Sequence, residues 1–190
     1  PMAIAARDWP RAPFDQIVAI NNAWRIRADW THAIHPWDFP PERHPVAGRG
    51  QVLVTEDEFV PAQNAYGGFV YAGATMVFTA AYWALHSLRP KVIAVLGCDM
   101  HYPATGPTHF YGTGSPDPLR DDITLRSLEA KSARLMVLAA RQGCAVVNLS
   151  DGPSRLVFPR RSREAAALAV PLDFPAAEVA AAKSREAALG

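Results

Sequence analysis

Two histidines and two tyrosines lie within eleven residues of a stretch rich in Gly, Pro and Thr. They are His101, Tyr102, His109 and Tyr111, in the stretch 101–118. Imidazole titrates near neutral pH and is the commonest general base, and a phenol can donate a hydrogen bond to a phosphate oxygen. A loop of this composition needs none of these side chains for a core. The cluster is therefore a candidate for catalysis, although a single loop histidine is more often simply exposed to solvent.

Polar side chains also follow two apolar runs of the chain. Asp99 comes shortly after the run 91–96, where a carboxylate can orient a nucleotide, bind a metal ion or cap a loop by accepting bonds from its amides. Asn21 and Asn22 follow the run 14–20, and their amides can contact the edges of a base or a ribose, or serve as turn residues. Both interpretations stay open for each of these positions.

A third candidate is the start of a predicted helix over 72–88. This helix would begin with Ala72, Gly73, Ala74 and Thr75. A helix N-terminus offers free N–H groups and a positive dipole to an anion. Gly73 would let a ligand approach the backbone closely. The chain has neither a GxGxxG nor a GxxxxGK[ST] motif, and no His, Cys or carboxylate cluster has the spacing of a metal site. Standard dinucleotide, P-loop and metal sites are therefore not predicted.

The elements that would position these residues alternate along the chain. Apolar runs predict strands over 14–20, 51–55, 91–96 and 144–149, and helical patterns predict helices over 72–88 and 122–142. This order predicts an α/β fold in which 17–20, 92–96 and 145–149 are parallel strands of one sheet. Ligands of such sheets bind outside the carboxyl ends of the strands. The segments that we expect at that one edge are 21–22, 97–102 and 148–150.

Composition excludes several classes of protein. The chain has 190 residues, of which 49% are hydrophobic and 19% charged, so it is not a wholly disordered chain. Its net charge of +1 gives no electrostatic reason to predict a nucleic-acid binder. The run 59–88 has no charged side chain, but proline, amide and glycine residues interrupt it, which favours a buried helix over a membrane span. We expect one domain over 1–161 and an Ala-rich tail over 162–190, either helical or disordered.

The two cysteines indicate the redox state of the compartment in which the protein works. Cys98 and Cys144 lie 46 positions apart inside apolar runs, so we expect two small buried hydrophobic residues and no disulfide or zinc site. Free buried thiols are typical of a reducing compartment, and we expect a cytoplasmic protein.

Four segments in order carry a resemblance to a known family: VAINNAW, AGATMVFTAAYWALHSLRPKVIAVLGCDMHY, THFYG and GCAVVNLSDGPSRLVFP. Over 1–160 the chain resembles phage and prophage proteins of the DUF115-like (MptE-like) type, and more distantly bacterial lipo-oligosaccharide sialyltransferases. The resemblance implies a Rossmann-like three-layer fold with a mostly parallel sheet. It also implies that the first strand and its Gly-x-Gly-Pro-Ser loop lie outside this chain. The Ala-rich tail or a second copy of the chain would then cover the apolar face left by that strand.

The same resemblance implies residue roles. His109 corresponds to the base that takes the proton of an acceptor hydroxyl, and His101 with Tyr102 corresponds to the group that holds the leaving phosphate. The sialyltransferases carry an Arg before the helix glycine, whereas this chain has Phe, Val and Tyr over 69–71, and Arg120 is the candidate to replace it. The remaining donor-binding candidates are Asn21, Asn22, Gly73, Ala74, Thr75 and Asp99.

The expected activity is that of a metal-independent glycosyltransferase. It would move a sugar from a nucleotide-sugar donor of the cytidine monophosphate type to an acceptor hydroxyl, without a separate cofactor. One alternative is a pterin or nucleotide pyrophosphokinase that binds Mg²⁺ through Asp99, although one carboxylate is poor provision for that ion. The other is a phage-derived binding or structural module without catalysis, because a fold does not determine a function.

Overall fold

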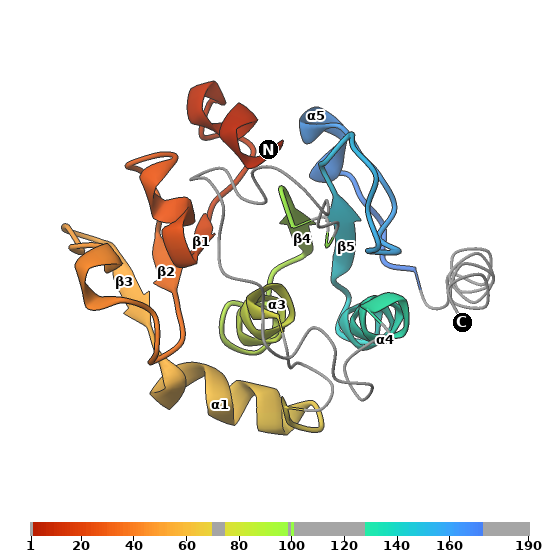
Figure 1. Cartoon of the computed structure of the whole chain (residues 1–190). Helices are drawn as coiled ribbons and strands as arrows, with labels where there is room; N and C mark the ends of the chain where they lie inside the picture. The colour runs from red at the N-terminus through yellow and green to blue at the C-terminus, as the bar shows by residue number, and fades with distance from the viewer. Residues whose placement is uncertain (1, 70–74, 99, 101–127, 173–190) are drawn as a thin grey trace.

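The computed structural model describes residues 2–69, 75–98, 100 and 128–172, and its strands form two parallel sheets (Figure 1). The first sheet has the order β1-β2-β3, and the second pairs β4 with β5. The bounds are β1 (Val18–Ile20), β2 (His32–Ile34), β3 (Val52–Val54), β4 (Val92–Val95) and β5 (Ala145–Asn148). All pairings are parallel, with Ile20 opposite Ile34, Ile34 opposite Val54 and Ala145 opposite Val92. The α/β prediction is thus confirmed.

The prediction of one sheet is wrong in one respect. Strands β4 and β5 pair in parallel as expected, but β1 belongs to the other sheet and pairs with β2. No backbone ladder joins β1 to β4 within the described residues. Strand β2 was not predicted, because its sequence His-Ala-Ile lacks the continuous apolar run that the equally short β1 and β3 show.

Helices pack around these strands. They are α1 (Glu56–Ala65), α3 (Met76–Ser87), α4 (Leu128–Ala140) and α5 (Arg163–Ala166), with short 3₁₀ helices η1 (Met2–Asp8), η2 (Asn21–Arg25) and η3 (Pro41–Arg43). The predicted helices over 72–88 and 122–142 are confirmed in their described parts as α3 and α4. Within the Ala-rich segment, Ser162 caps α5 by accepting a hydrogen bond from the N–H of Ala165, and residues 173–190 lie outside the described part.

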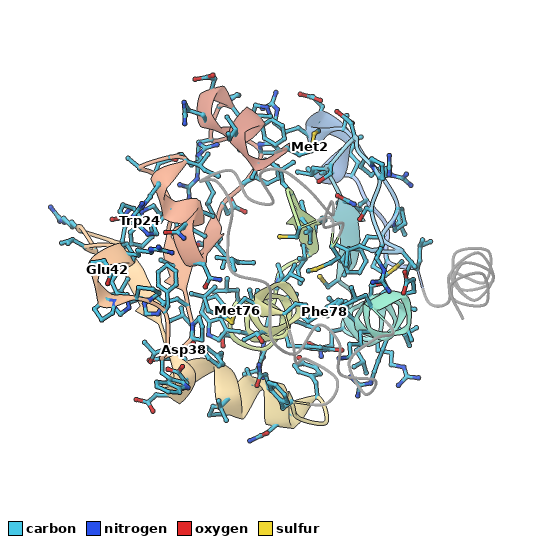
Figure 2. All side chains as sticks on the ribbon, viewed as in Figure 1. Met2, Trp24, Asp38, Glu42, Met76 and Phe78 are labelled. Atoms are coloured by element: carbon cyan, nitrogen blue, oxygen red, sulfur yellow. The ribbon has the colours of Figure 1, made fainter. Side chains whose placement is uncertain are left out.

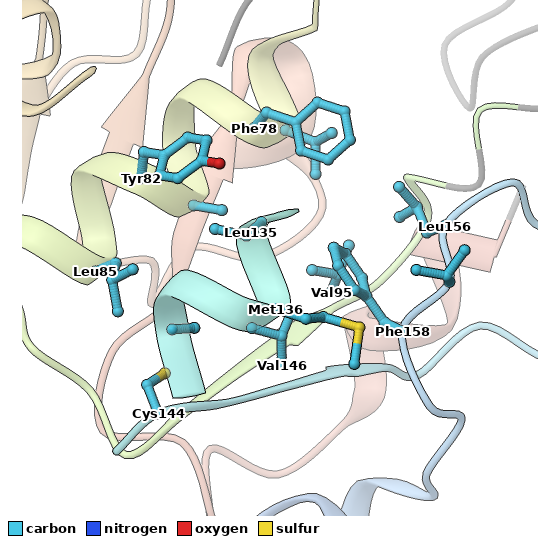
Figure 3. Packing of buried hydrophobic residues seen from close by; sticks show 14 of the residues in the cluster. Phe78, Tyr82, Leu85, Val95, Leu135, Met136, Cys144, Val146, Leu156 and Phe158 are labelled. Carbon is cyan, nitrogen blue, oxygen red and sulfur yellow. The ribbon is translucent and has the colours of Figure 1, made fainter. Parts of the chain in front are cut away.

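Helix α3 is buried over most of its length and lies in the row of helices with α1 and α4, next to the gap between β1 and β4 (Figure 1). Nine consecutive residues, 77–85, are buried. Met76 points toward the β1–β3 side and Phe78 toward α4 (Figure 2), in agreement with the two apolar clusters that share this helix. In the larger cluster, Tyr82 and Leu85 pack with Leu135 of α4 (Figure 3). A helix that is apolar all round requires burial of this kind.

Both faces of the second sheet pack against apolar clusters, with β5 fully buried and β4 partly buried. Val95 and Val146 face the cluster of α3 and α4, whereas Ala94 and Val147 face a cluster on the opposite side that contains Trp9. Alternate residues of a strand point to opposite faces, so burial on both sides demands a continuous apolar run. This explains why these two strands could be predicted from sequence.

The packing against helix α3 shows in which direction the strands of each sheet run. The His32 ring, at the amino end of β2, packs against Trp83 in the second half of α3, with ring centroids 5.0 Å apart. The start of α3 at Thr75 therefore lies toward the carboxyl ends of β1–β3. Strand β4 begins at Val92, five residues after α3 ends at Ser87, and packs along that helix, so it also runs antiparallel to it. We call the side where the strands end and α3 begins the carboxyl edge.

Helix α1 was missed, although its start carries a local signal. The side chain of Thr55 and the N–H of Glu58 form one half of a capping box, and the Glu58 carboxylate accepts from the N–H of Thr55 at 2.8 Å to form the other half. Hydrogen bonding from Thr55 also lowers the pKa of Glu58. Pro61 lies inside this helix and obscured the pattern.

The uncharged run 59–88 is divided between α1 and α3. Helix α3 has 12 residues, against the roughly 20 that a membrane span requires. In the described ranges, none of the helices combines the length and apolarity needed to cross a bilayer.

The prediction for the cysteines is confirmed for Cys144 only. Cys144 is buried, and burial raises the pKa of its thiol to about 11. Cys98 is only partly buried, because it lies in the turn that follows β4. Neither residue forms a disulfide.

Helix η1 packs against the turn after β4. Gly97 has φ of +71°, and a Cβ at this position would lie 2.6 Å from the Cβ of Ala3 and 2.9 Å from its backbone nitrogen. Glycine is therefore required here both for the backbone conformation and for the close approach.

We expect Gly97→Ala to lower the free energy of unfolding by about 2–5 kcal/mol, the sum of left-handed strain and overpacking. Gly143→Ala is the matched control, because Gly143 has φ of +72° and a methyl group added there would have nothing within 4 Å. Gly143→Ala should lower the free energy of unfolding only by the cost of the left-handed backbone, about 1–2 kcal/mol. Denaturant unfolding measures both variants, and equal losses would show that η1 does not pack on this turn.

Burial against Trp83 lowers the pKa of His32 from its ordinary value of 6.5. The folded protein therefore binds this proton less readily than the unfolded chain, so stability is fully present above pH 6.5 and falls as the pH drops toward the lower folded pKa. His32→Phe keeps a ring beside Trp83 and should remove this part of the pH dependence. Parallel stability curves for the two proteins between about pH 5 and 7 would contradict the assignment.

Candidate functional site

The carboxyl edge gathers buried polar atoms that have no hydrogen-bond partner. In the described part of the chain there are five such side-chain atoms. Asn21 Oδ1 and Asn22 Oδ1 follow β1, and His35 Nε2 follows β2. Asn148 Nδ2 lies on the last residue of β5, and Thr75 Oγ1 lies on the residue before α3. Buried polar groups in folded proteins are nearly always paired, and each exception needs an explanation. Their location at one edge makes this the candidate site.

The end of β1 turns sharply into η2. Asn21 has φ of +50°, a conformation that asparagine tolerates better than most residues. This turn places Asn22 in the first part of η2, where only 2% of its surface is exposed. The prediction that these two residues follow a parallel strand is confirmed, although this strand belongs to the sheet of β2 and β3 and not to that of β4 and β5.

His35 follows β2 directly and is 6% exposed. Its Nδ1 lies 3.1 Å from the carbonyl oxygen of Pro36, which can only accept, so Nδ1 carries the proton. In the neutral ring, Nε2 is then an acceptor, and it has no partner. The ring packs against His44 and Phe39, with centroids 4.2 Å and 5.3 Å away, so its position is well defined.

The loop after β2 is held from both sides. His44 Nε2 donates to the carbonyl of Phe39 at 2.8 Å, and the indole N–H of Trp24 donates to the carbonyl of Arg43 at 3.0 Å. The N–H of Trp37 donates to Glu56 at the start of α1. These bonds tie the loop that follows His35 to η2 and α1.

The ends of β4 and β5 are joined through a serine. Asn148 Oδ1 accepts from the N–H of Ser150 at 2.9 Å, and the Oγ of Ser150 accepts from the N–H of Gly97 at 3.0 Å. The first bond fixes the orientation of the Asn148 amide, so Nδ2 is a donor with no partner, and the residue is 1% exposed. Sequence reasoning placed 148–150 at this edge but did not select Asn148 as a site residue.

Thr75 is the N-cap residue of α3. Its side chain makes no capping bond, and its Oγ1 is buried without a partner. A hydroxyl at this position, next to the free N–H groups of the first turn, is suited to an anion. The structure thus brings Thr75 to the same edge as Asn21 and Asn22.

The other predicted site residues lie outside the described residues. These are Gly73, Ala74, Asp99, His101, Tyr102 and His109, together with Arg120. Among the residues that are described, no group of three or more His, Cys, Asp or Glu could hold a metal ion. The predictions for the catalytic cluster and for metal independence therefore stay predictions.

A hollow of about 450 Å³ lies away from the carboxyl edge. It is lined by residues at or near the C-terminal ends of α1, α3 and α4, which include Tyr66, His86, Arg89 and Gln142. Gln142 donates to the hydroxyl of Tyr66 at 2.8 Å, and none of the five unpartnered atoms belongs to its lining. The hollow therefore offers the guanidinium of Arg89 but no unpartnered buried side-chain atom that a ligand would satisfy.

Comparisons of the chain with models of protein families, with curated proteins and with solved structures found no match. The site at the carboxyl edge is therefore supported by the geometry of the chain itself.

We expect the unpartnered carbonyl oxygen of Asn22 to lower the free energy of unfolding of the ligand-free protein. Asn22→Leu removes a buried polar group, so the free energy of unfolding should stay level or rise by up to about 1 kcal/mol. Asn148→Leu is the matched control, because it deprives the N–H of Ser150 of its acceptor and should cost about 1–3 kcal/mol. Thermal and denaturant unfolding of the ligand-free proteins measure both. A loss at Asn22 as large as at Asn148 would indicate a structural role for both.

Proposed function

We propose that the protein binds a nucleotide sugar at the carboxyl edge and transfers the sugar to an acceptor hydroxyl without a metal ion. The observation that supports this best is the set of five buried, unpartnered polar atoms at the ends of β1, β2 and β5 and at the start of α3. Leaving them unpaired costs free energy in the empty protein, and a polar ligand along this edge would offset that cost.

The two sides of the edge suit different parts of such a ligand. On one side, Thr75 at the N-terminus of α3 and the amide N–H of Asn148 are donors, which suits a phosphate. On the other side, the free nitrogen of the His35 ring is an acceptor, which suits a hydroxyl. A nucleotide sugar carries both kinds of group.

The proposed reaction uses the loop cluster of the sequence analysis. His109 takes the proton of the acceptor hydroxyl, whose oxygen then forms a bond to the anomeric carbon of the donor sugar. The bond from that carbon to the phosphate oxygen breaks, and the nucleoside monophosphate leaves with the bonding electrons. His101 and Tyr102 donate hydrogen bonds to the departing phosphate, where negative charge develops.

The finer description of the fold belongs to the same proposal. Strands β1 and β4 both run antiparallel to α3 and have no ladder between them. One further parallel strand between them would join the five described strands into a single sheet of Rossmann-like type. The carboxyl edge would then be continuous from β3 to β5.

Binding tests the first part of the proposal. Titration calorimetry with cytidine, uridine and adenosine nucleotides, each with and without Mg²⁺, should show metal-independent binding of cytidine monophosphate. Asn148→Asp keeps the Ser150 bond but replaces a donor with a negative charge, so it should weaken the binding of the nucleotide. Binding of ATP that requires Mg²⁺ would favour a kinase, and no binding of any nucleotide would favour a non-catalytic module.

His109→Ala tests the chemical step. We expect turnover to fall by roughly 10²- to 10⁴-fold, the usual contribution of a general base, with almost no change in donor affinity, because the base acts on the acceptor. Single-turnover kinetics and calorimetry on the same preparation measure the two quantities. A variant that loses stability and activity in proportion would show that His109 is a structural residue.

A further inference from the structure

We propose that His35, with Asn21 and Asn22, forms a subsite that binds the hydroxyl groups of a sugar ring. This inference rests on the proposed function, because it names the part of the ligand that binds beside β1 and β2. Neither the loop histidines nor the helix N-terminus takes part in it.

The three side chains come from neighbouring positions of one sheet. Ile20 pairs with Ile34 in the parallel ladder of β1 and β2, so the residues that follow them, Asn21 and His35, leave the sheet side by side. Adjacent strands lie roughly 4.8 Å apart, which is the spacing of functional groups that one sugar ring can reach. Asn22 is the next residue along the chain and the one buried residue of η2.

The unpartnered atoms of this group are all acceptors. The Pro36 carbonyl fixes the proton of His35 on Nδ1, so Nε2 offers a lone pair. Asn21 and Asn22 each present a buried carbonyl oxygen without a partner. Carboxylates and phosphates are mostly ionised at neutral pH and act chiefly as acceptors, whereas a hydroxyl donates a hydrogen bond directly. The chemistry that satisfies this subsite is therefore a ring with vicinal hydroxyls.

The surroundings of His35 allow it to act as a fixed acceptor. Its ring packs against both His44 and Phe39, which also stack on each other, and His44 donates its own Nε2 proton to the Phe39 carbonyl. Nε2 of His35 is thus held in one position, with little rotational freedom to lose when a ligand binds. A nucleotide sugar contains two rings that could bind here, the ribose and the transferred sugar.

The experiment compares His35→Phe with His44→Phe by titration and by ¹⁵N NMR of the histidine rings. His35→Phe keeps a ring in the stack and removes the acceptor, while His44→Phe alters the same stack without touching that acceptor. The probes are cytidine monophosphate, 2′-deoxycytidine monophosphate and free sialic acid. We expect His35→Phe to lower the affinity for the hydroxyl-bearing probe by roughly 5- to 100-fold and His44→Phe to change it by less than about 2-fold.

NMR gives the decisive readout, because an acceptor nitrogen changes its chemical shift when it receives a hydrogen bond. The Nε2 signal of His35 should move when the probe binds, while the Nδ1 proton stays in place. If the ribose occupies the subsite, the 2′-deoxy nucleotide binds more weakly and moves the signal less. If the transferred sugar occupies it, free sialic acid alone moves the signal.

The two proposals fail in different ways. Tight binding of cytidine monophosphate with an unmoved Nε2 signal and equal affinity in His35→Phe overturns the subsite and leaves the proposed function standing; a bound water would then be the partner of this atom. If the nucleotide does not bind but free sialic acid moves the Nε2 signal of His35, the proposed function is overturned and the hydroxyl subsite is retained. An unmoved signal with every probe overturns the subsite.

Discussion

The burial of α3 over most of its length is the constraint on which the rest of the molecule depends. Its residues 77–85 are all buried, and they contribute to both of the larger apolar clusters. The two sheets share no backbone hydrogen bonds within the described residues, so the packing on α3 holds them in a common orientation. The same packing sets the start of this helix at the ends of the strands, and the polar residues at those ends become neighbours as a result.

The contrast between the core and the carboxyl edge is chemical. The interior of the second sheet is apolar on both faces, and Ser132, a buried polar residue of α4, is fully paired with the Glu129 carbonyl and the Val157 N–H. Buried Glu129 is likewise paired, with Arg155 at 2.9 Å. The unpartnered atoms of the described residues, by comparison, lie at the one edge. Sites built for ligands commonly keep such unsatisfied groups at the expense of stability.

Sequence reasoning succeeded where burial leaves a pattern. Strand β4 and the first three residues of β5 are apolar because both faces of their sheet pack against apolar clusters, and Asn21 and Asn22 could be placed because they follow the apolar strand β1. It failed where a polar or proline residue interrupts the pattern, as His32 does in β2 and Pro61 does in α1. The strand β2 has three residues, and missing it meant missing His35, which follows it. The amide nitrogen of Asn148 is left without a partner because the amide oxygen accepts from the N–H of Ser150. Sequence periodicity does not reveal such a contact between a side chain and the backbone.

The two cysteines differ in a way that has a practical consequence. The thiol of Cys144, with a pKa of about 11, is buried directly before β5; it is almost never a thiolate at neutral pH and so resists alkylation. Cys98 is partly accessible and lies beside the Gly97 turn, at the end of β4. A maleimide dye should thus attach at one position without any engineering of the chain, next to the edge proposed to bind the ligand, and give a native fluorescent reporter of occupancy.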